Sequence, residues 1–129
     1  MSNMKHAEAT LAGCNGPFFP PEVDELNKQL GRPSSYDGAW LKEVGETIEE
    51  FQDISRPTTS DGYVWFWSLD FSIGRGKVLV LIPWAQDWDK TDGTQSDRGI
   101  AVHTKGVDEV RAAEVVQKLV SAVKNRREW

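Results

Sequence analysis

The stretch from Tyr63 to Trp84 constrains the fold more than any other part of the chain. Two β-rich runs flank a Gly74-Arg75-Gly76 tip, a pattern typical of a β-hairpin. In the first run every second residue from Tyr63 to Ile73 is apolar, so one face is predicted to be buried along its whole length. The second run is apolar on both faces from Val78 to Ile82, so this strand is predicted to lie inside a sheet.

The length of the turn decides which side chains of the hairpin share the core. A two-residue turn, at Gly74-Arg75 or at Arg75-Gly76, places Phe71 on the same face as Val78, Val80 and Ile82. A three-residue turn without a bulge brings Leu79 and Leu81 to that face instead. Under the two-residue turn we expect Trp65, Trp67, Leu69 and Phe71 to face the last helix of the chain.

Before the hairpin, the sequence predicts an arm and one short helix. Residues 1 to 19 show no period and contain Gly13, Gly16 and Pro17, so we expect a flexible arm. Pro21 suits the first position of a helix, and Gly31 suits its end. Three residues spaced along one face of this helix are predicted to be buried: Val23, Leu26 and Leu30.

Residues 38 to 54 admit two interpretations. Leu41, Val44, Ile48 and Phe51 follow a helical period, with Asp37 as a possible N-cap, and we favour one helix. The rival is a short helix that ends near Gly45, followed by a strand from Thr47 to Ile54, because glycine weakens a helix interior. Residues 56 to 62 are predicted to be a turn-rich linker into the hairpin.

After the hairpin we expect a long loop, a strand and the clearest helix of the chain. The loop covers residues 85 to 97, and the strand runs from Arg98 to Thr104. The helix runs from Val107 to about Arg126 and should cover one face of the sheet. Its apolar stripe is Val107, Val110, Ala113, Val116, Leu119, Val120 and Val123.

These elements predict a single α+β domain over residues 1–129. Its architecture is a small antiparallel sheet built on a central β-hairpin, with helices packed on one face. The single cysteine, Cys14, cannot form an internal disulfide, and neither a signal peptide nor a membrane-length apolar run is visible. We therefore expect a cytoplasmic protein without a membrane partner.

Charge is distributed unevenly along the chain. The net charge is −5, yet residues 98 to 129 carry seven basic and four acidic side chains, while residues 1 to 97 carry eight and sixteen. An acidic bulk argues against nucleic acid as the main ligand, because contacts to phosphates need a basic face. It suits a basic protein partner, or solubility alone.

Few residues here are suited to catalysis. His6, Cys14 and His103 have no metal-ligand spacing, and the acidic loop that begins at Asp87 fails the calcium-binding pattern of an EF-hand. His103 on its strand is the best general base, and no nucleophile elbow accompanies it. Asp70 lies in the middle of its strand on the same face as Ser68 and Ser72, a pattern typical of a face exposed to solvent. We expect a non-enzyme with no metal and no cofactor.

The remaining candidate is an acidic binding surface. It combines the side chains around the end of the favoured helix with those of the long loop, where a tryptophan stands between two aspartates. The residues predicted to contact a partner are Glu46, Glu49, Glu50, Asp53, Asp87, Trp88, Asp89 and Asp92. The alternative is that the two acidic segments are separate and merely solvated.

With the acidic stretches at residues 46–50 and 87–89, this layout resembles the small bacterial immunity proteins of contact-dependent growth inhibition systems. These families share no motif, so no family residue is carried over. The resemblance implies a tight complex with a cognate toxin domain, often a basic nuclease, whose active site is blocked. Two other classes stay open: a type III secretion chaperone, which a firm dimer would favour, and a small hydrolase that uses His103 and a carboxylate.

Overall fold

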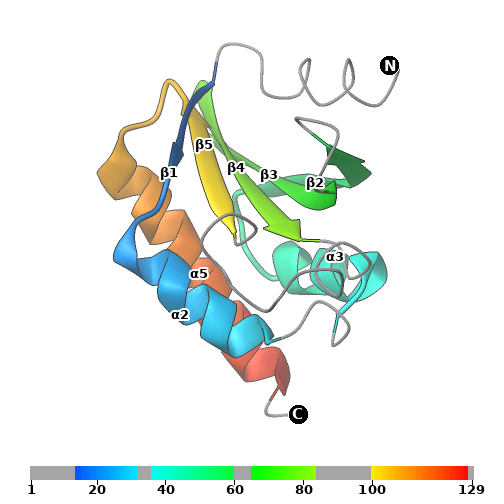
Figure 1. Ribbon diagram of the computed structural model, residues 1–129. Helices are drawn as coiled ribbons and strands as arrows, with labels where there is room; N and C mark the ends of the chain where they lie inside the picture. Colours follow the sequence, from blue (N-terminus) through cyan, green and yellow to red (C-terminus); the bar gives the residue numbers. More distant parts are fainter. Residues whose placement is uncertain (1–13, 32–35, 60–64, 84–99, 128–129) are drawn as a thin grey trace.

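The computed structural model describes residues 14–31, 36–59, 65–83 and 100–127. The described elements form an α+β fold, as predicted, with an antiparallel five-stranded sheet and three helices (Figure 1). In chain order they are β1 (Asn15–Phe18), α2 (Pro21–Leu30), α3 (Gly38–Glu46), β2 (Phe51–Thr59), β3 (Trp65–Ile73), β4 (Gly76–Pro83), β5 (Ala101–Lys105) and α5 (Glu109–Arg127).

The sheet has the strand order β1-β5-β4-β3-β2, and every neighbouring pair is antiparallel. β3 and β4 pair with Phe71 opposite Val78 and Ile73 opposite Gly76, so the turn between them is the two-residue Gly74-Arg75. This turn is one of the two two-residue turns that the sequence allowed, and the three-residue turn is not formed. β4 lies in the middle of the sheet, which explains why all its residues from Val78 to Ile82 are buried.

The single helix favoured over residues 38–54 is wrong, and the rival interpretation holds in outline. Helix α3 ends at Glu46, a turn follows, and β2 begins at Phe51. A Cβ atom on Gly45 would lie 2.6 Å from the Phe51 ring, so the chain folds back with this ring against the glycine. Asp37 caps α3 as expected, because its side chain accepts a hydrogen bond from the Trp40 amide at 2.8 Å.

Two further sequence predictions near the sheet edges are also wrong. Residues 56–59 belong to edge strand β2 rather than to a linker; the register of β2 shifts between Ser55 and Thr58, and proline is tolerated at such an irregular edge. Residues 15–18 do not form a flexible arm, because β1 pairs with β5, with Phe18 opposite Val102. The remainder of the predicted arm, residues 1–13, lies outside the described residues.

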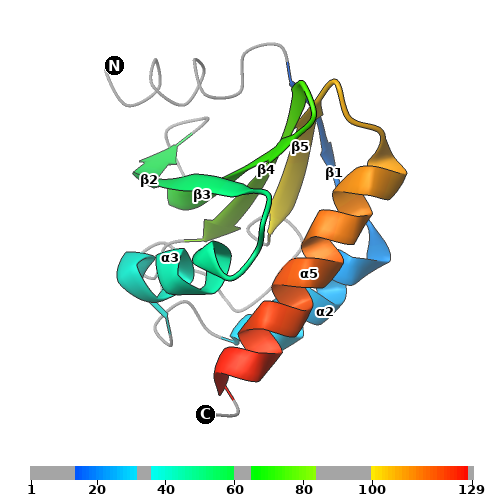
Figure 2. The same ribbon diagram turned by 180° about the vertical axis from the view of Figure 1, so that it is seen from behind.

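Helices α2 and α5 lie side by side over one face of the sheet (Figure 2). α2 begins and ends where predicted and buries Val23, Leu26 and Leu30. The stripe of α5 differs at its start, since Val110 is 71 % exposed. The buried residues of this helix are Ala112, Val115, Val116, Leu119, Val120 and Val123.

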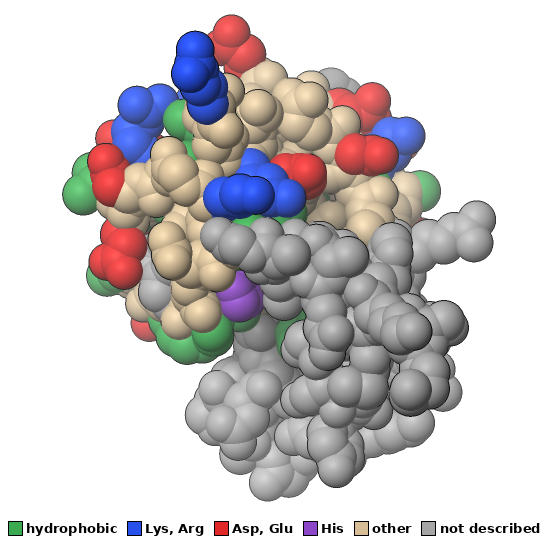
Figure 3. Space-filling view, turned by 90° about the horizontal axis from the view of Figure 1, so that it is seen from above, with side chains coloured by type: hydrophobic (Ala, Val, Ile, Leu, Met, Phe, Trp, Pro, Cys, Tyr) green, Lys and Arg blue, Asp and Glu red, His purple; other side chains and the backbone are tan. Residues whose placement is uncertain are grey.

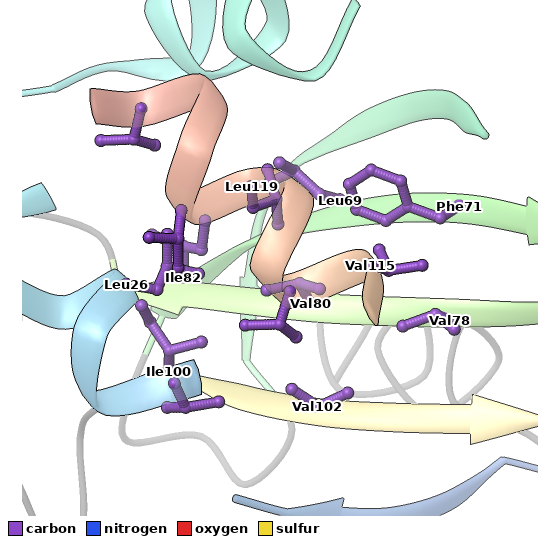
Figure 4. Packing of buried hydrophobic residues seen from close by; sticks show 14 of the residues in the cluster. Leu26, Leu69, Phe71, Val78, Val80, Ile82, Ile100, Val102, Val115 and Leu119 are labelled. Carbon is purple, nitrogen blue, oxygen red and sulfur yellow. The ribbon is translucent and has the colours of Figure 1, made fainter. Parts of the chain in front are cut away.

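The core lies between these helices and the sheet (Figure 4). Leu69 and Phe71 of β3 point toward Leu119 and Val115 of α5, as the sequence predicted for this face. Trp67 is partly buried against the same core, and its ring lies against Gly38 at the start of α3, where a Cβ would come within 2.5 Å of it. The side chain of Trp65, also predicted to face the last helix, lies outside the described side chains.

The second face of the sheet is buried near its middle and open near the hairpin turn. Ser68, Leu79, Leu81 and His103 are all less than 9 % exposed. Toward the turn the same face becomes polar, with Asp70 half-buried and Lys105 exposed. A hydrophobic centre therefore gives way to a charged rim at the end of the hairpin.

Candidate functional site

A groove runs between the turn that joins α3 to β2 and the middle of α5. Its volume is about 470 Å³, and we call it the α3–β2 groove. The residues that line it are Thr47, Ile48, Glu49, Glu50, Gln117, Lys118, Ser121, Ala122 and Asn125. Two of the predicted binding residues, Glu49 and Glu50, line the groove, and Glu46 is the exposed last residue of α3, next to the lining residue Thr47.

Glu50 is the acidic residue of this groove that is paired with a cation of α5. Its Oε2 forms an ion pair with Lys118 of α5, and the hydrogen bond from Lys118 lowers the pKa of Glu50. Among the described residues, its other oxygen, Oε1, is buried and accepts no hydrogen bond. The carboxyl also interacts with the backbone amide of Glu50 itself, which further lowers its pKa.

Replacing Lys118 with Gln is expected to raise the pKa of Glu50 toward its ordinary value, because the main cause of the lowered pKa is removed. At pH values above the unfolded-state pKa of Glu50, the ion pair stabilises the fold in full. This stabilisation is lost as the pH falls through the folded-state pKa, which is the lower of the two. A titration of the Glu50 carboxyl by NMR in both proteins measures the change. An unchanged midpoint would show that the ion pair does not form in solution.

The basic end of α5 is bound to the other helices. Arg126 pairs with Glu43 of α3, and Arg127 donates a hydrogen bond of 2.9 Å to the Leu30 carbonyl at the end of α2. The Arg127 guanidinium also lies over the Trp40 ring, 4.4 Å from its centroid, in a cation–π contact. Part of the charge asymmetry seen in the sequence therefore stabilises the fold itself.

The eight residues predicted to bind a partner do not all lie together. Glu49 and Glu50 line the α3–β2 groove, and Glu46 lies beside it at the end of α3. Asp53 lies on β2, opposite Asp70 on the second face of the sheet, and so falls outside this group. The other four, Asp87, Trp88, Asp89 and Asp92, lie outside the described residues.

His103 and Asp70 are both on the second face of the sheet. His103 is buried opposite Leu79 rather than exposed on the sheet surface, and this burial lowers its pKa. Asp70 is half-buried, and desolvation raises its pKa while Lys77 opposes the shift. In the described parts of the chain, no three His, Cys, Asp or Glu side chains lie together in a way that could hold a metal ion.

A basic hollow, which was not predicted from the sequence, lies at the hairpin end of the second face. Its volume is about 340 Å³, and its lining is Gln52, Asp70, Ser72, Arg75, Gly76, Lys77 and Lys105. Seen from above, Lys and Arg side chains gather beside acidic ones at this end of the molecule (Figure 3). The register of the hairpin could have indicated part of this hollow, because it places Lys77 beside Ser72. Lys105 joins them only through the pairing of β4 with β5, which the sequence does not display.

Comparison of the chain with models of protein families, with curated proteins and with solved structures finds no match. Within the four described ranges, no helix is both long and apolar enough to cross a membrane.

Proposed function

We propose that this chain is a non-catalytic binding protein, and in particular an immunity protein that binds a cognate toxin domain with a basic surface. The observation that carries the proposal is the acidic wall of the α3–β2 groove. Glu49 is exposed in the lining, Glu50 lies in the lining paired with Lys118, and Glu46 is exposed beside the groove at the end of α3. An Arg or Lys side chain that enters the groove would gain charge-assisted hydrogen bonds from this wall.

The exposed and the paired carboxylates play different parts in this proposal. Glu46 and Glu49 attract a cationic partner over a distance and so speed association. Glu50 is already held by Lys118, so its position in the groove is prepared before binding. The loop residues Asp87, Trp88, Asp89 and Asp92 stay a predicted second part of the interface.

Replacing Glu46 and Glu49 together with Gln is expected to slow association with the toxin domain about three- to tenfold at low salt. The difference should shrink as salt is raised, because exposed charges are screened. The measurement is surface plasmon resonance at two salt concentrations, with the toxin domain encoded next to this chain as the partner. A matched control replaces Glu22 and Asp24 of α2 with Gln and Asn, which removes the same charge from another surface.

A growth assay separates a binding function from the hydrolase alternative. Cells that produce the toxin domain should be protected equally by the parent chain and by a stably folded His103→Gln variant. Loss of protection in that variant would favour the hydrolase. If no toxin domain is encoded beside the chain, the proposed immunity function is wrong. If the Glu46/Glu49 variant binds like the parent at both salt concentrations, the proposed interface is wrong.

A further inference from the structure

The hollow at the hairpin end is unusual in this acidic protein because its charge is basic. Three cations line it, Arg75, Lys77 and Lys105, against one carboxylate, Asp70. Among the described residues, no salt bridge joins any of the three cations to a carboxylate. By contrast, Lys118 and Arg126 of α5 are both paired with glutamates.

The register of the sheet sets the basic side chains of this hollow against each other. Lys77 on β4 is the direct partner of Lys105 on β5, and Ser72 on β3 is the direct partner of Lys77 on the other side. Side chains directly opposite on antiparallel strands lie about 5 Å apart at Cβ, and two like charges in this position destabilise the pair. An anion between the two ammonium groups would remove this repulsion.

The carboxylates near the hollow only partly offset its cations. Asp70 lies two residues along β3 from Ser72, and its charge interacts with Lys77. Its own nearest acidic neighbour is Asp53 on the edge strand, whose Oδ1 accepts a hydrogen bond from the Ile54 amide at 2.8 Å. Asp70 is therefore at the side of the hollow toward β2, while Lys77 and Lys105 are at the side toward β5.

The backbone holds this arrangement tightly. A Cβ atom on Gly76 would lie 2.5 Å from the carbonyl oxygen of Lys105 and 2.7 Å from that of Gly106. The start of β4 thus packs closely on the end of β5, and a methyl group of Val107 lies at the same contact, 2.6 Å from the position of that Cβ. Lys77 and Lys105 are carried on neighbouring backbone segments whose separation is set by this contact.

We propose that the hollow at the hairpin end binds an oxyanion of phosphate size between Lys77, Lys105 and Arg75. The two lysines supply point charges, and the guanidinium of Arg75 supplies a planar pair of donors. Ser72 and Gln52 are neutral donors on the adjoining strands. The site lies on the second face of the sheet and does not depend on the α3–β2 groove.

The test is a ¹H–¹⁵N NMR titration of the full chain with inorganic phosphate at pH 7, with sodium chloride keeping the ionic strength constant. Saturable shifts are expected for the amides of Ser72 to Lys77 and of Lys105. A double Lys77→Gln and Lys105→Gln variant should bind phosphate at least tenfold more weakly, since two charge-assisted contacts are lost. Lys42→Gln, an exposed lysine of α3, is the matched control and should leave the affinity unchanged.

Asp70→Asn gives an effect of the opposite sign. Removing this negative charge should tighten phosphate binding about threefold or more, because a like charge no longer faces the anion. A merely structural cluster of lysines would not respond in this way. The unligated double variant should also unfold at a denaturant concentration no lower than the parent, since the facing lysines repel each other.

Acetate in place of phosphate identifies the source of the oxyanion. Shifts of the same amides with phosphate alone indicate a phosphoryl group, while equal shifts with acetate indicate a carboxylate, such as an acidic side chain of a partner. The proposal is overturned if neither anion produces saturable shifts in this region. It is also overturned if the double lysine variant responds to phosphate as the parent does.

Discussion

Replacing Leu69 with Ala is expected to lower the free energy of unfolding by about 2–5 kcal/mol, as for other fully buried leucines. Leu69 is 0 % exposed and lies on the face of β3 that α5 covers. Its direct partners on the neighbouring strands are Ile54 and Val80, so strands hold it on both sides. The neighbours of Leu69 cannot all move inward, and the substitution therefore leaves a cavity.

Equilibrium unfolding in urea measures this loss, and Val110→Ala is its control. Val110 is also an aliphatic residue, and it was predicted from the helical period to be buried, yet it is 71 % exposed on α5. Its truncation should change the free energy of unfolding by less than about 0.5 kcal/mol. A larger loss for Val110→Ala than for Leu69→Ala would mean that the buried faces of β3 and α5 are assigned wrongly.

The hairpin and the helices α2 and α5 were predictable because their sequence signals are local. The alternation along β3 and the two-residue turn were enough to place Phe71 beside Val78. The proline at position 21 and the glycine at position 31 delimited α2. Local patterns of this kind depend on residues a few positions apart, which the sequence displays directly.

Edge strand β1 was not predicted, and β2 appeared only in part, in the rival interpretation, because the pairing of these strands is not local. Leu41, Val44 and Ile48 are buried and Phe51 packs against the core, so the helical period identified the right residues. It did not show that the chain changes from helix to strand before Phe51. That change depends on the fit of an aromatic ring to the Gly45 backbone and on pairing with β3, neither of which has a periodic signature.

Some carboxylates of the acidic segment are used in ion pairs within the fold, with partners that are distant in sequence. Glu50 pairs with a lysine 68 positions away, and Glu43 pairs with an arginine 83 positions away. A count of charges along the chain cannot separate carboxylates used within the fold from those that remain exposed. Glu46 and Glu49 belong to the second kind, so the proposed interface depends on them most.

Replacing Gly76 with Ala is expected to lower the free energy of unfolding by about 1–3 kcal/mol, the usual cost of an extra methyl group in a closely packed place. The added Cβ would meet two backbone carbonyl oxygens, at 2.5 Å and 2.7 Å, and a methyl group of Val107 at 2.6 Å. Backbone atoms cannot rotate away as a side chain can. β4 and the end of β5 must therefore move apart.

Gly74→Ala is the control that separates this steric effect from backbone strain. A Cβ on Gly74 would meet nothing within 4 Å, but its φ of 58° is costly for alanine, by about 1–2 kcal/mol. The two variants should differ in where the structure changes. Gly76→Ala should shift the amide NMR signals of Thr104 and Lys105 on β5, while Gly74→Ala should confine its shifts to the turn. If Gly76→Ala leaves the β5 signals unchanged, the close packing of these two strands does not exist in solution.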